Sequence, residues 1–277
     1  MVKVKKFAIE ITKKIYRLIF CRKSLYKLNL FIYKMSLHGI GILNFENKKL
    51  SGEKKFIKSI GSKIKRPVVF DVGANEGEYS KEVKSSNNAS KIYAFEPHPE
   101  NFKKLDEAIS GENVHKIRAA CGSNEGQIYL YDHDEKGSRH ATPVEGVMEN
   151  IHGREKKATK VKVKKIDHFV NSKEINRIDI LKIDTEGYEM EVMIGAKEAI
   201  KRGRVRCIQF EFNEMNVESR VFAKDIVKLL KKFSFFRMMP DGLVRLGEYN
   251  PWEYEIFAFQ NIVAVRQDDE NIVKDLL

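Results

Sequence analysis

The stretch that most constrains the fold is residues 67–80, PVVFDVGANEGEYS. Residues 68–70 form a short apolar run closed by a turn signal, which is typical of a strand buried on both faces, as in a parallel sheet. Asp71 ends this strand, and Gly73 and Gly77 frame a loop that leads into a helix. Glycines let the backbone approach a ligand closely, and a helix N-terminus offers unpaired N–H groups. The stretch therefore predicts a strand–loop–helix unit with a ligand above the strand end.

The spacing inside this loop distinguishes between cofactors. Its pattern is D-x-G-x-N-x-G, with Asn75 between the two glycines, whereas a dinucleotide fingerprint is G-x-G-x-x-G. A carboxylate in the pocket would repel a pyrophosphate but would suit a cationic or hydroxyl-bearing ligand. S-adenosylmethionine has a sulfonium, an amino group and no phosphate, so the loop favours it over NAD. A plain tight turn is the alternative interpretation of the loop taken alone.

Three further predicted strands also end in acids. KIYAFE ends in Glu96, which follows Gly77 by 19 positions, about the offset at which an acid bonds ribose hydroxyls in nucleotide-binding folds. IDILKIDTEG carries Asp184 and Glu186 at its carboxyl end, and RCIQFE ends in Glu211. The carboxyl ends of parallel strands share one edge of a sheet, so these acids are expected to line one crevice.

Three spaced motifs, DVGANEG, AFEPHPENFKKL and LKIDTEGYEMEVMIGA, occur in this order and are followed by NIVAV at residues 261–265. Together they resemble the FkbM-type S-adenosylmethionine-dependent methyltransferases over about residues 52–265. The resemblance implies an α/β, Rossmann-like class I methyltransferase fold: a mostly parallel seven-stranded sheet with helices on both faces and an antiparallel last strand. The cofactor contacts that it implies are Asp71, Gly73, Asn75, Gly77, Glu96, Pro97 and Ala120.

The charge of the chain is concentrated in its first part. The net charge is +12, but residues 1–66 hold 18 Lys/Arg against three acids, and the remaining residues have a net charge of −3. We therefore expect a basic, mainly helical extension over residues 1–50 and a methyltransferase domain over residues 51–277. A nearly neutral domain argues against a nucleic-acid groove across it.

Residues 3–35 show a helical pattern, with Phe7, Ile11, Ile15 and Leu18 on one side and basic residues on the other. The apolar stretches are too short and too interrupted by charge for a secretory or transmembrane segment. Two interpretations stay open: a helix packed on the domain, or a helix lying on an anionic membrane surface. The expected location is cytoplasmic, with or without peripheral contact at the inner membrane face.

Cysteine usage fits a reducing compartment. The three cysteines, Cys21, Cys121 and Cys207, are widely spaced and contain no C-x-x-C pair. Neither a disulfide framework nor a zinc site is therefore expected, and no metal is predicted.

Methyl transfer from S-adenosylmethionine requires few catalytic groups from the protein. A sulfonium is an excellent leaving group, so the protein mainly positions the reactants and arranges charge, while a hydroxyl acceptor needs a base. The candidate catalytic residues are Asp184, Glu186, Glu211 and His140; Asp184 would also suit a helix N-cap. His140, with Ser138 and Arg139, lies in the polar, aperiodic segment 132–160, which we interpret as an acceptor-site lid.

The sequence lacks the N/D-P-P-Y/W tetrad that serves a base nitrogen and the Pro-Cys pair that serves a pyrimidine carbon. The favoured function is therefore O-methylation of a sugar, glycan or other small molecule. One alternative is an NAD-dependent sugar-modifying oxidoreductase, which the missing third glycine disfavours. The others are an RNA methyltransferase that uses the basic extension and a non-catalytic scaffold, in which strand-end acids would have no purpose.

Overall fold

The structure is a computed structural model that describes residues 2–46, 50–133, 138, 140–153 and 157–277. The chain divides into two compact units, Met1–Leu43 and Asn44–Leu277. The predicted division at residue 50 stays a prediction. Arg139, which we expected in the acceptor-site lid, lies outside the described residues.

The first unit contains two helices, α1 (Val2–Phe20) and α2 (Tyr26–Gly39), separated by a short 3₁₀ turn, η1 (Lys23–Leu25). Asn29 joins the two helices, because its side chain accepts a hydrogen bond from Tyr16 Oη at 2.7 Å and donates one to the Phe20 carbonyl at 2.8 Å. No helix among the described residues is long and apolar enough to cross a membrane.

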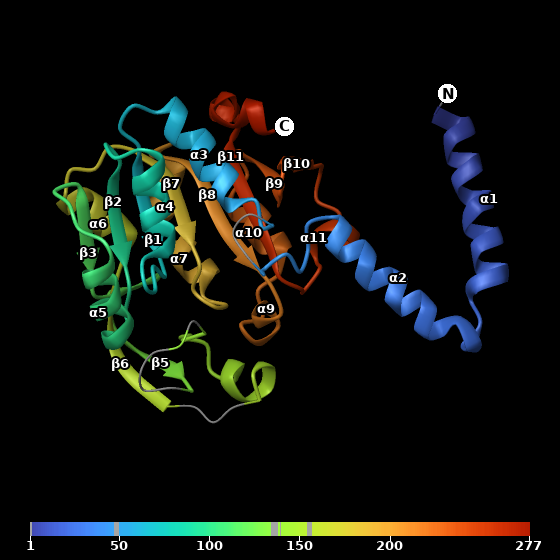
Figure 1. Cartoon of the computed structure of the whole chain (residues 1–277), viewed down its shortest axis with the longest axis horizontal. Helices are drawn as coiled ribbons and strands as arrows, with labels where there is room; N and C mark the ends of the chain where they lie inside the picture. Colours follow the sequence, from blue (N-terminus) through green and yellow to red (C-terminus); the bar gives the residue numbers. More distant parts are fainter. Residues whose placement is uncertain (1, 47–49, 134–137, 139, 154–156) are drawn as a thin grey trace. The chain divides into compact units, whose positions relative to one another are not determined.

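The second unit is built on an eight-stranded sheet in the order β10-β9-β11-β8-β7-β1-β2-β3 (Figure 1). Strands β1, β2, β3, β7 and β8 run parallel, whereas β11 is antiparallel to both β8 and β9. The predicted mostly parallel sheet with an antiparallel last strand is confirmed, and β10 adds an eighth strand at the edge. The strands are β1 (Val68–Val72), β2 (Lys91–Phe95), β3 (Val114–Ile117), β7 (Ile178–Ile183), β8 (Val205–Phe212), β9 (Phe233–Met239), β10 (Gly242–Leu246) and β11 (Gln260–Arg266).

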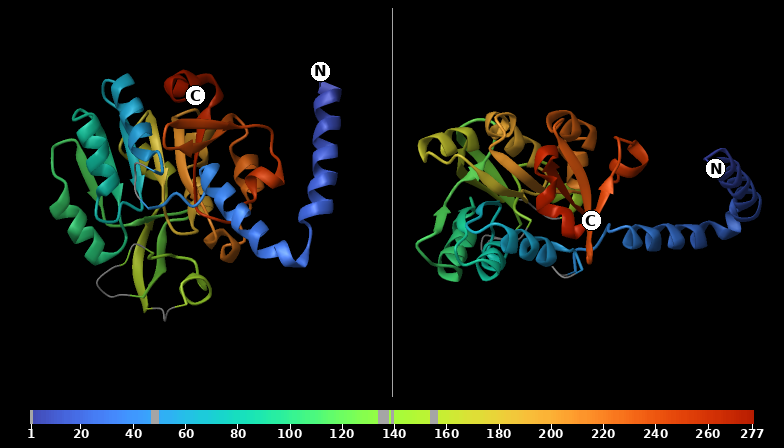
Figure 2. Two further views of the ribbon diagram at one scale, coloured as in Figure 1. Left: turned by 45° about the vertical axis from the view of Figure 1, so that its right-hand side comes forward. Right: turned by 90° about the horizontal axis from the view of Figure 1, so that it is seen from above.

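Helices cover both faces of this sheet, as Figure 2 shows from two sides. Each is amphipathic and buries its apolar side in one of two hydrophobic clusters, which is why the strands between them are apolar on both faces. One face carries α3 (Glu53–Lys63), α4 (Glu78–Ser86), α5 (Pro99–Ala108) and η3 (Gln267–Leu276). The other carries α6 (Ile166–Ser172), α7 (Glu189–Gly195), α8 (Lys197–Lys201) and α10 (Ala223–Leu229).

A small three-stranded sheet, in the order β4-β6-β5, is inserted after β3. In Figure 1 it lies at the lower end of the main sheet, the end at which α9 (Met215–Glu218) follows β8. Its strands are β4 (Ala120–Cys121), β5 (Gly126–Asp132) and β6 (Lys157–Lys164).

The described part of segment 132–160 is more ordered than its polar composition predicts. Thr142 pairs with Tyr131 in an antiparallel bridge, and residues 147–151 form one helical turn, η2 (Val147–Ile151). Val147 and Met148 are fully buried against Met215 of α9. These few apolar residues hold this segment against the carboxyl edge of the main sheet.

Candidate active site

The β1–α4 loop is a tight turn that only glycine allows at two positions. Gly73 has a φ of 80°, and a Cβ there would collide with the Asp184 carbonyl oxygen. Gly77 has a φ of 81° immediately before α4, and a Cβ there would lie 2.7 Å from Leu105 Cδ1. Asn75 between them also adopts a positive φ, 48°. The two glycines therefore let the loop pass close to the Asp184 backbone and to Leu105, where a Cβ would not fit.

Glu96 fastens this loop to the next strand end. Its carboxylate is 5% exposed and accepts hydrogen bonds from the Asn75 and His98 backbone N–H groups, each at 2.8 Å. Burial raises the pKa of Glu96 to about 7, although the two backbone N–H groups act in the opposite direction. Pro97, which lies between Glu96 and His98 in the chain, is half-buried. Ala120 lies buried in β4 of the small sheet.

A buried ammonium lies between two of the strand-end acids. Lys182 of β7 is the register partner of Asp71, which is fully buried. Its Nζ is 3.4 Å from Asp71 Oδ1 and 3.0 Å from Asp184 Oδ2, and it lies 5.3 Å from the centre of the Tyr79 ring. Ser80 Oγ donates to the other Asp71 oxygen at 2.7 Å. Burial alone lowers the pKa of Lys182, but the Asp184 and Asp71 carboxylates raise it above its ordinary value, so the side chain is charged.

Our sequence reasoning did not identify Lys182. The available signal was a single Lys inside the apolar strand IDILKI, where a charge is tolerated only with a buried partner. The residue opposite it in the neighbouring strand is Asp71, and this pairing becomes visible only once β1 and β7 are placed side by side.

The predicted catalytic residues meet at the same edge. His140 Nδ1 is 3.5 Å from Glu186 Oε1, and Thr142 Oγ1 donates to the Glu186 carbonyl at 2.6 Å. Glu186 has a φ of 55°, an uncommon conformation for a residue other than glycine. Burial raises its pKa, His140 lowers it, and the Asp184 carboxylate raises it further. Burial, followed by the Asp184 and Glu186 carboxylates, also raises the pKa of Glu211 well above its ordinary value.

Glu189, a neighbouring acid, has a structural role. Its carboxylate accepts hydrogen bonds from the Thr185 and Gly187 N–H groups, at 3.0 and 3.2 Å, at the start of α7. Burial raises its pKa to about 7. In the described ranges, no group of three or more His, Cys, Asp or Glu side chains is placed to hold a metal ion.

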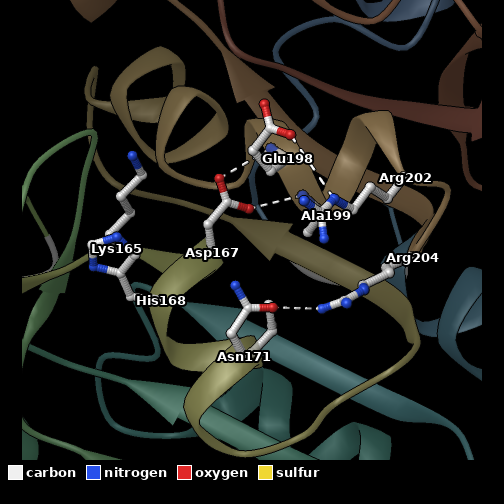
Figure 3. A pocket seen from close by; sticks show the side chains of 9 residues that line it. Lys165, Asp167, His168, Asn171, Glu198, Ala199, Arg202 and Arg204 are labelled. Atoms are coloured by element: carbon white, nitrogen blue, oxygen red, sulfur yellow. Dashed lines mark hydrogen bonds and ion pairs between the residues drawn. The ribbon is translucent and has the colours of Figure 1, made fainter.

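A cavity of about 210 Å³ lies elsewhere, between α6 and α8 (Figure 3). It is beside the amino end of β8, since Arg204 in its wall directly precedes that strand. Asp167 in the wall of this cavity belongs to α6, but its carboxylate accepts hydrogen bonds from the Glu198 and Ala199 N–H groups of α8, at 3.0 and 2.8 Å. None of the predicted site residues lines this cavity.

Replacing Lys182 by Met should destabilise the folded protein by about 3–5 kcal/mol, because it leaves the buried Asp71 carboxylate without its counter-charge. Urea unfolding at pH 7.5 measures this loss. The double variant Asp71→Asn/Lys182→Met removes both charges and should recover a large part of it. An equal loss in the single and double variants would contradict the idea that the ion pair is the cause.

Comparison with known proteins agrees with this geometry. The methyltransferase FkbM domain matches residues 71–236, more than half of the chain. The hexuronic acid methyltransferase AglP of Haloferax volcanii is 26% identical over 189 residues, which cover 67% of this chain and 70% of that protein. The 2-O-methyltransferase NoeI of Sinorhizobium fredii is 20% identical over 186 residues, covering 64% and 76%.

Among solved structures, the plantazolicin methyltransferase BpumL in complex with SAH covers 96% of this chain and 99% of its own, with a TM-score of 0.40 and 9% identity. The family assignment does not depend on this weak likeness. The domain match confirms the family that the three motifs predict, and it removes the NAD-dependent alternative. The chain belongs to the FkbM methyltransferase family and is an S-adenosylmethionine-dependent methyltransferase.

Proposed function

We propose that this enzyme methylates a hydroxyl group of a sugar, free or within a glycan. The observation that carries the proposal is the contact between His140 and Glu186, 3.5 Å apart, at the edge that also holds Asp184 and Glu211. A histidine oriented by a buried carboxylate is a typical base for a hydroxyl proton. The names of the two relatives, a hexuronic acid methyltransferase and a 2-O-methyltransferase, support a sugar hydroxyl as the acceptor.

The residues around the β1–α4 loop fit S-adenosylmethionine. The positive-φ glycines leave room above the strand ends, where a Cβ on Gly73 would meet the backbone of Asp184. Several carboxyl groups surround a single described ammonium, Lys182, which suits a ligand that carries a sulfonium. We assign the cofactor contacts to the predicted set: Asp71, Gly73, Asn75, Gly77, Glu96, Pro97 and Ala120. When bound, this cofactor supplies an electrophilic methyl group that needs no further activation.

The catalytic residues then divide their roles. His140 is half-exposed and directs Nδ1 toward Glu186, and we assign its Nε2 the role of accepting the hydroxyl proton of an acceptor. Glu186 orients the ring and stabilises the imidazolium that forms. Asp184 already serves as the counter-ion of Lys182. Glu211, whose pKa is raised well above its ordinary value by burial and the neighbouring carboxylates, completes this group of acids.

We also propose that α1 lies on an anionic membrane surface. The helix carries six Lys/Arg and one acid, and Phe7, Ile11, Ile15 and Leu18 of its apolar stripe are all exposed. Each basic side chain near an anionic surface contributes about 1 kcal/mol, and an inserted apolar face adds to this. Such contact would bring the enzyme to a glycan assembled on a lipid carrier.

The first prediction from the proposed function concerns the cofactor. Glu96→Ala should weaken S-adenosylmethionine binding by about 1.5–3 kcal/mol, the value of a lost charged hydrogen bond. Because burial raises the pKa of Glu96 to about 7, the wild-type affinity should fall as the pH drops below about 7, when this carboxylate takes up a proton. Calorimetry across this pH range measures both effects, with the exposed Glu100→Ala as the control. Unchanged affinity in Glu96→Ala would remove the ribose assignment.

The second prediction concerns the base. His140→Gln should lower kcat by about 10²- to 10⁴-fold while the cofactor affinity stays unchanged, and Glu186→Gln should lower it by a smaller factor. His168→Gln, an exposed histidine on α6, is the control. Asp184→Asn is nearly isosteric and tests charge alone; we expect reduced turnover. If Asp184→Asn retains full activity, Asp184 has only a structural role, and if His140→Gln does so, the base is elsewhere.

The third prediction concerns the membrane. The full chain should sediment with phosphatidylglycerol-containing vesicles, and salt should weaken this binding. Replacing Phe7, Ile11 and Ile15 by Ser should abolish it, whereas Val244→Ser, at an apolar residue on β10 that is 53% exposed, should not. Equal sedimentation of both variants would show that α1 does not bind the membrane.

A further inference from the structure

Every polar group of Ser138 makes a hydrogen bond. Its N–H group and its hydroxyl donate to the two carboxylate oxygens of Asp132, at 2.7 and 2.5 Å. Its carbonyl accepts a hydrogen bond from Asn101 Nδ2 at 2.9 Å. Its hydroxyl oxygen also accepts the N–H group of His140 at 3.1 Å. These bonds fix the backbone at residue 138, two positions before His140.

Asp132 and Asn101, which hold Ser138, are themselves buried. Asp132 is the last residue of β5 and is 3% exposed, and Asn101 on α5 is 2% exposed. A carboxylate removed from water needs hydrogen-bond donors or cations around it. Besides Ser138, Asp132 has the backbone N–H of His133 at 2.6 Å and Nε2 of the buried His98 at 3.9 Å. Side chains enclosed in this way form a rigid support.

The start of α5 joins this support to the assigned cofactor contacts. His98 is the N-cap residue of α5, and its backbone N–H group donates to Glu96 at 2.8 Å. Asn101 lies in the first turn of the same helix. The turn that holds Glu96 therefore also holds Ser138, on the far side of the segment from Glu186.

His140 lies between two anchored residues. Ser138 precedes it by two positions, and the fully buried Thr142 follows it by two and donates to the Glu186 carbonyl at 2.6 Å. The His140 ring lies 4.7 Å from that of His152, and its Nδ1 is 3.5 Å from Glu186 Oε1. Because the chain on both sides of His140 is tied down, the place of its half-exposed ring depends on these anchors.

We propose that Ser138 is a positioning residue that holds the His140 ring beside Glu186, and that Asp132 and Asn101 act through it. This inference rests on the proposed function, in which His140 removes the hydroxyl proton of the acceptor. A base must come within hydrogen-bond reach of that proton, and a misplacement of about 1 Å can cost about 10²-fold in rate. The hydroxyl of Ser138 takes no part in the reaction itself.

The first test observes the His140 ring directly in the full-length protein. The histidines are labelled with ¹³C and ¹⁵N, and His140→Gln identifies the nuclear magnetic resonance signals of this ring. Ser138→Ala should shift these signals, and so should Asn101→Leu, which removes the bond to the Ser138 carbonyl from inside the domain. Ser138→Thr keeps the hydroxyl and should leave the signals in place. The control is Ser85→Ala, an exposed serine whose hydroxyl bonds to the Glu82 carbonyl of its own helix.

The second test measures turnover with methyl β-glucuronide and methyl β-glucoside as acceptors and radiolabelled S-adenosylmethionine. Ser138→Ala should lower kcat about ten- to hundredfold with the cofactor affinity unchanged, and Ser138→Thr should restore most of this loss. In a His140→Gln background, Ser138→Ala should have no further effect, because the base that it positions is already absent. A purely structural role would add to the loss in that background and would weaken cofactor binding as well.

Unchanged His140 signals in both Ser138→Ala and Asn101→Leu would overturn the inference while leaving the proposed function intact. Additive losses of kcat from Ser138→Ala and His140→Gln would overturn it too. If the wild-type enzyme methylates neither sugar, the proposed function itself fails, and the ring signals then decide alone whether Ser138 holds His140 in place.

Discussion

The carboxyl edge of the main sheet depends on the buried ammonium of Lys182. Strands β1 and β7 bring Asp71 and Lys182 opposite each other, and Asp184 follows two residues later. Removing the Asp71 carboxylate from water at this point without a cation would cost several kcal/mol, whereas the Asp184 carboxylate stays 31% exposed. One Lys compensates both, and this allows the β1–α4 loop to pass close to the β7 end without an uncompensated charge beneath it.

The same cation does not compensate the remaining acids. Burial raises the pKa values of Glu96, Glu186 and Glu211, which means that their ionised forms lack a sufficient positive partner within the protein. A cationic ligand would supply that charge. The electrostatics of the site therefore agree with the loop chemistry: both favour a sulfonium cofactor over a pyrophosphate.

Most of this arrangement could be predicted from the sequence, because it follows from local patterns. Short apolar runs that end in an acid indicate buried parallel strands, and parallel strands bring their carboxyl ends to one edge, so Asp71, Glu96 and Asp184 were placed together correctly. Contacts between residues on different strands or helices could not be predicted in this way, because local sequence patterns do not show which elements lie side by side. Lys182 became interpretable only with β1 beside it, and Asp167 caps α8 rather than its own helix because α8 packs beside it.

The contacts of the segment between β5 and β6 could likewise not be predicted from local sequence patterns, and they bear on the proposed catalytic residues. Its polar, aperiodic composition predicts a loop, yet Thr142 bonds both to Tyr131 and to the Glu186 carbonyl. Two contacts to Glu186, one from Thr142 and one from His140, thus fix the position of a residue whose backbone is already in an uncommon conformation. A base carried on an insertion is less rigid than one on a strand, and in the role proposed for His140 the contact with Glu186 would orient its ring for proton transfer.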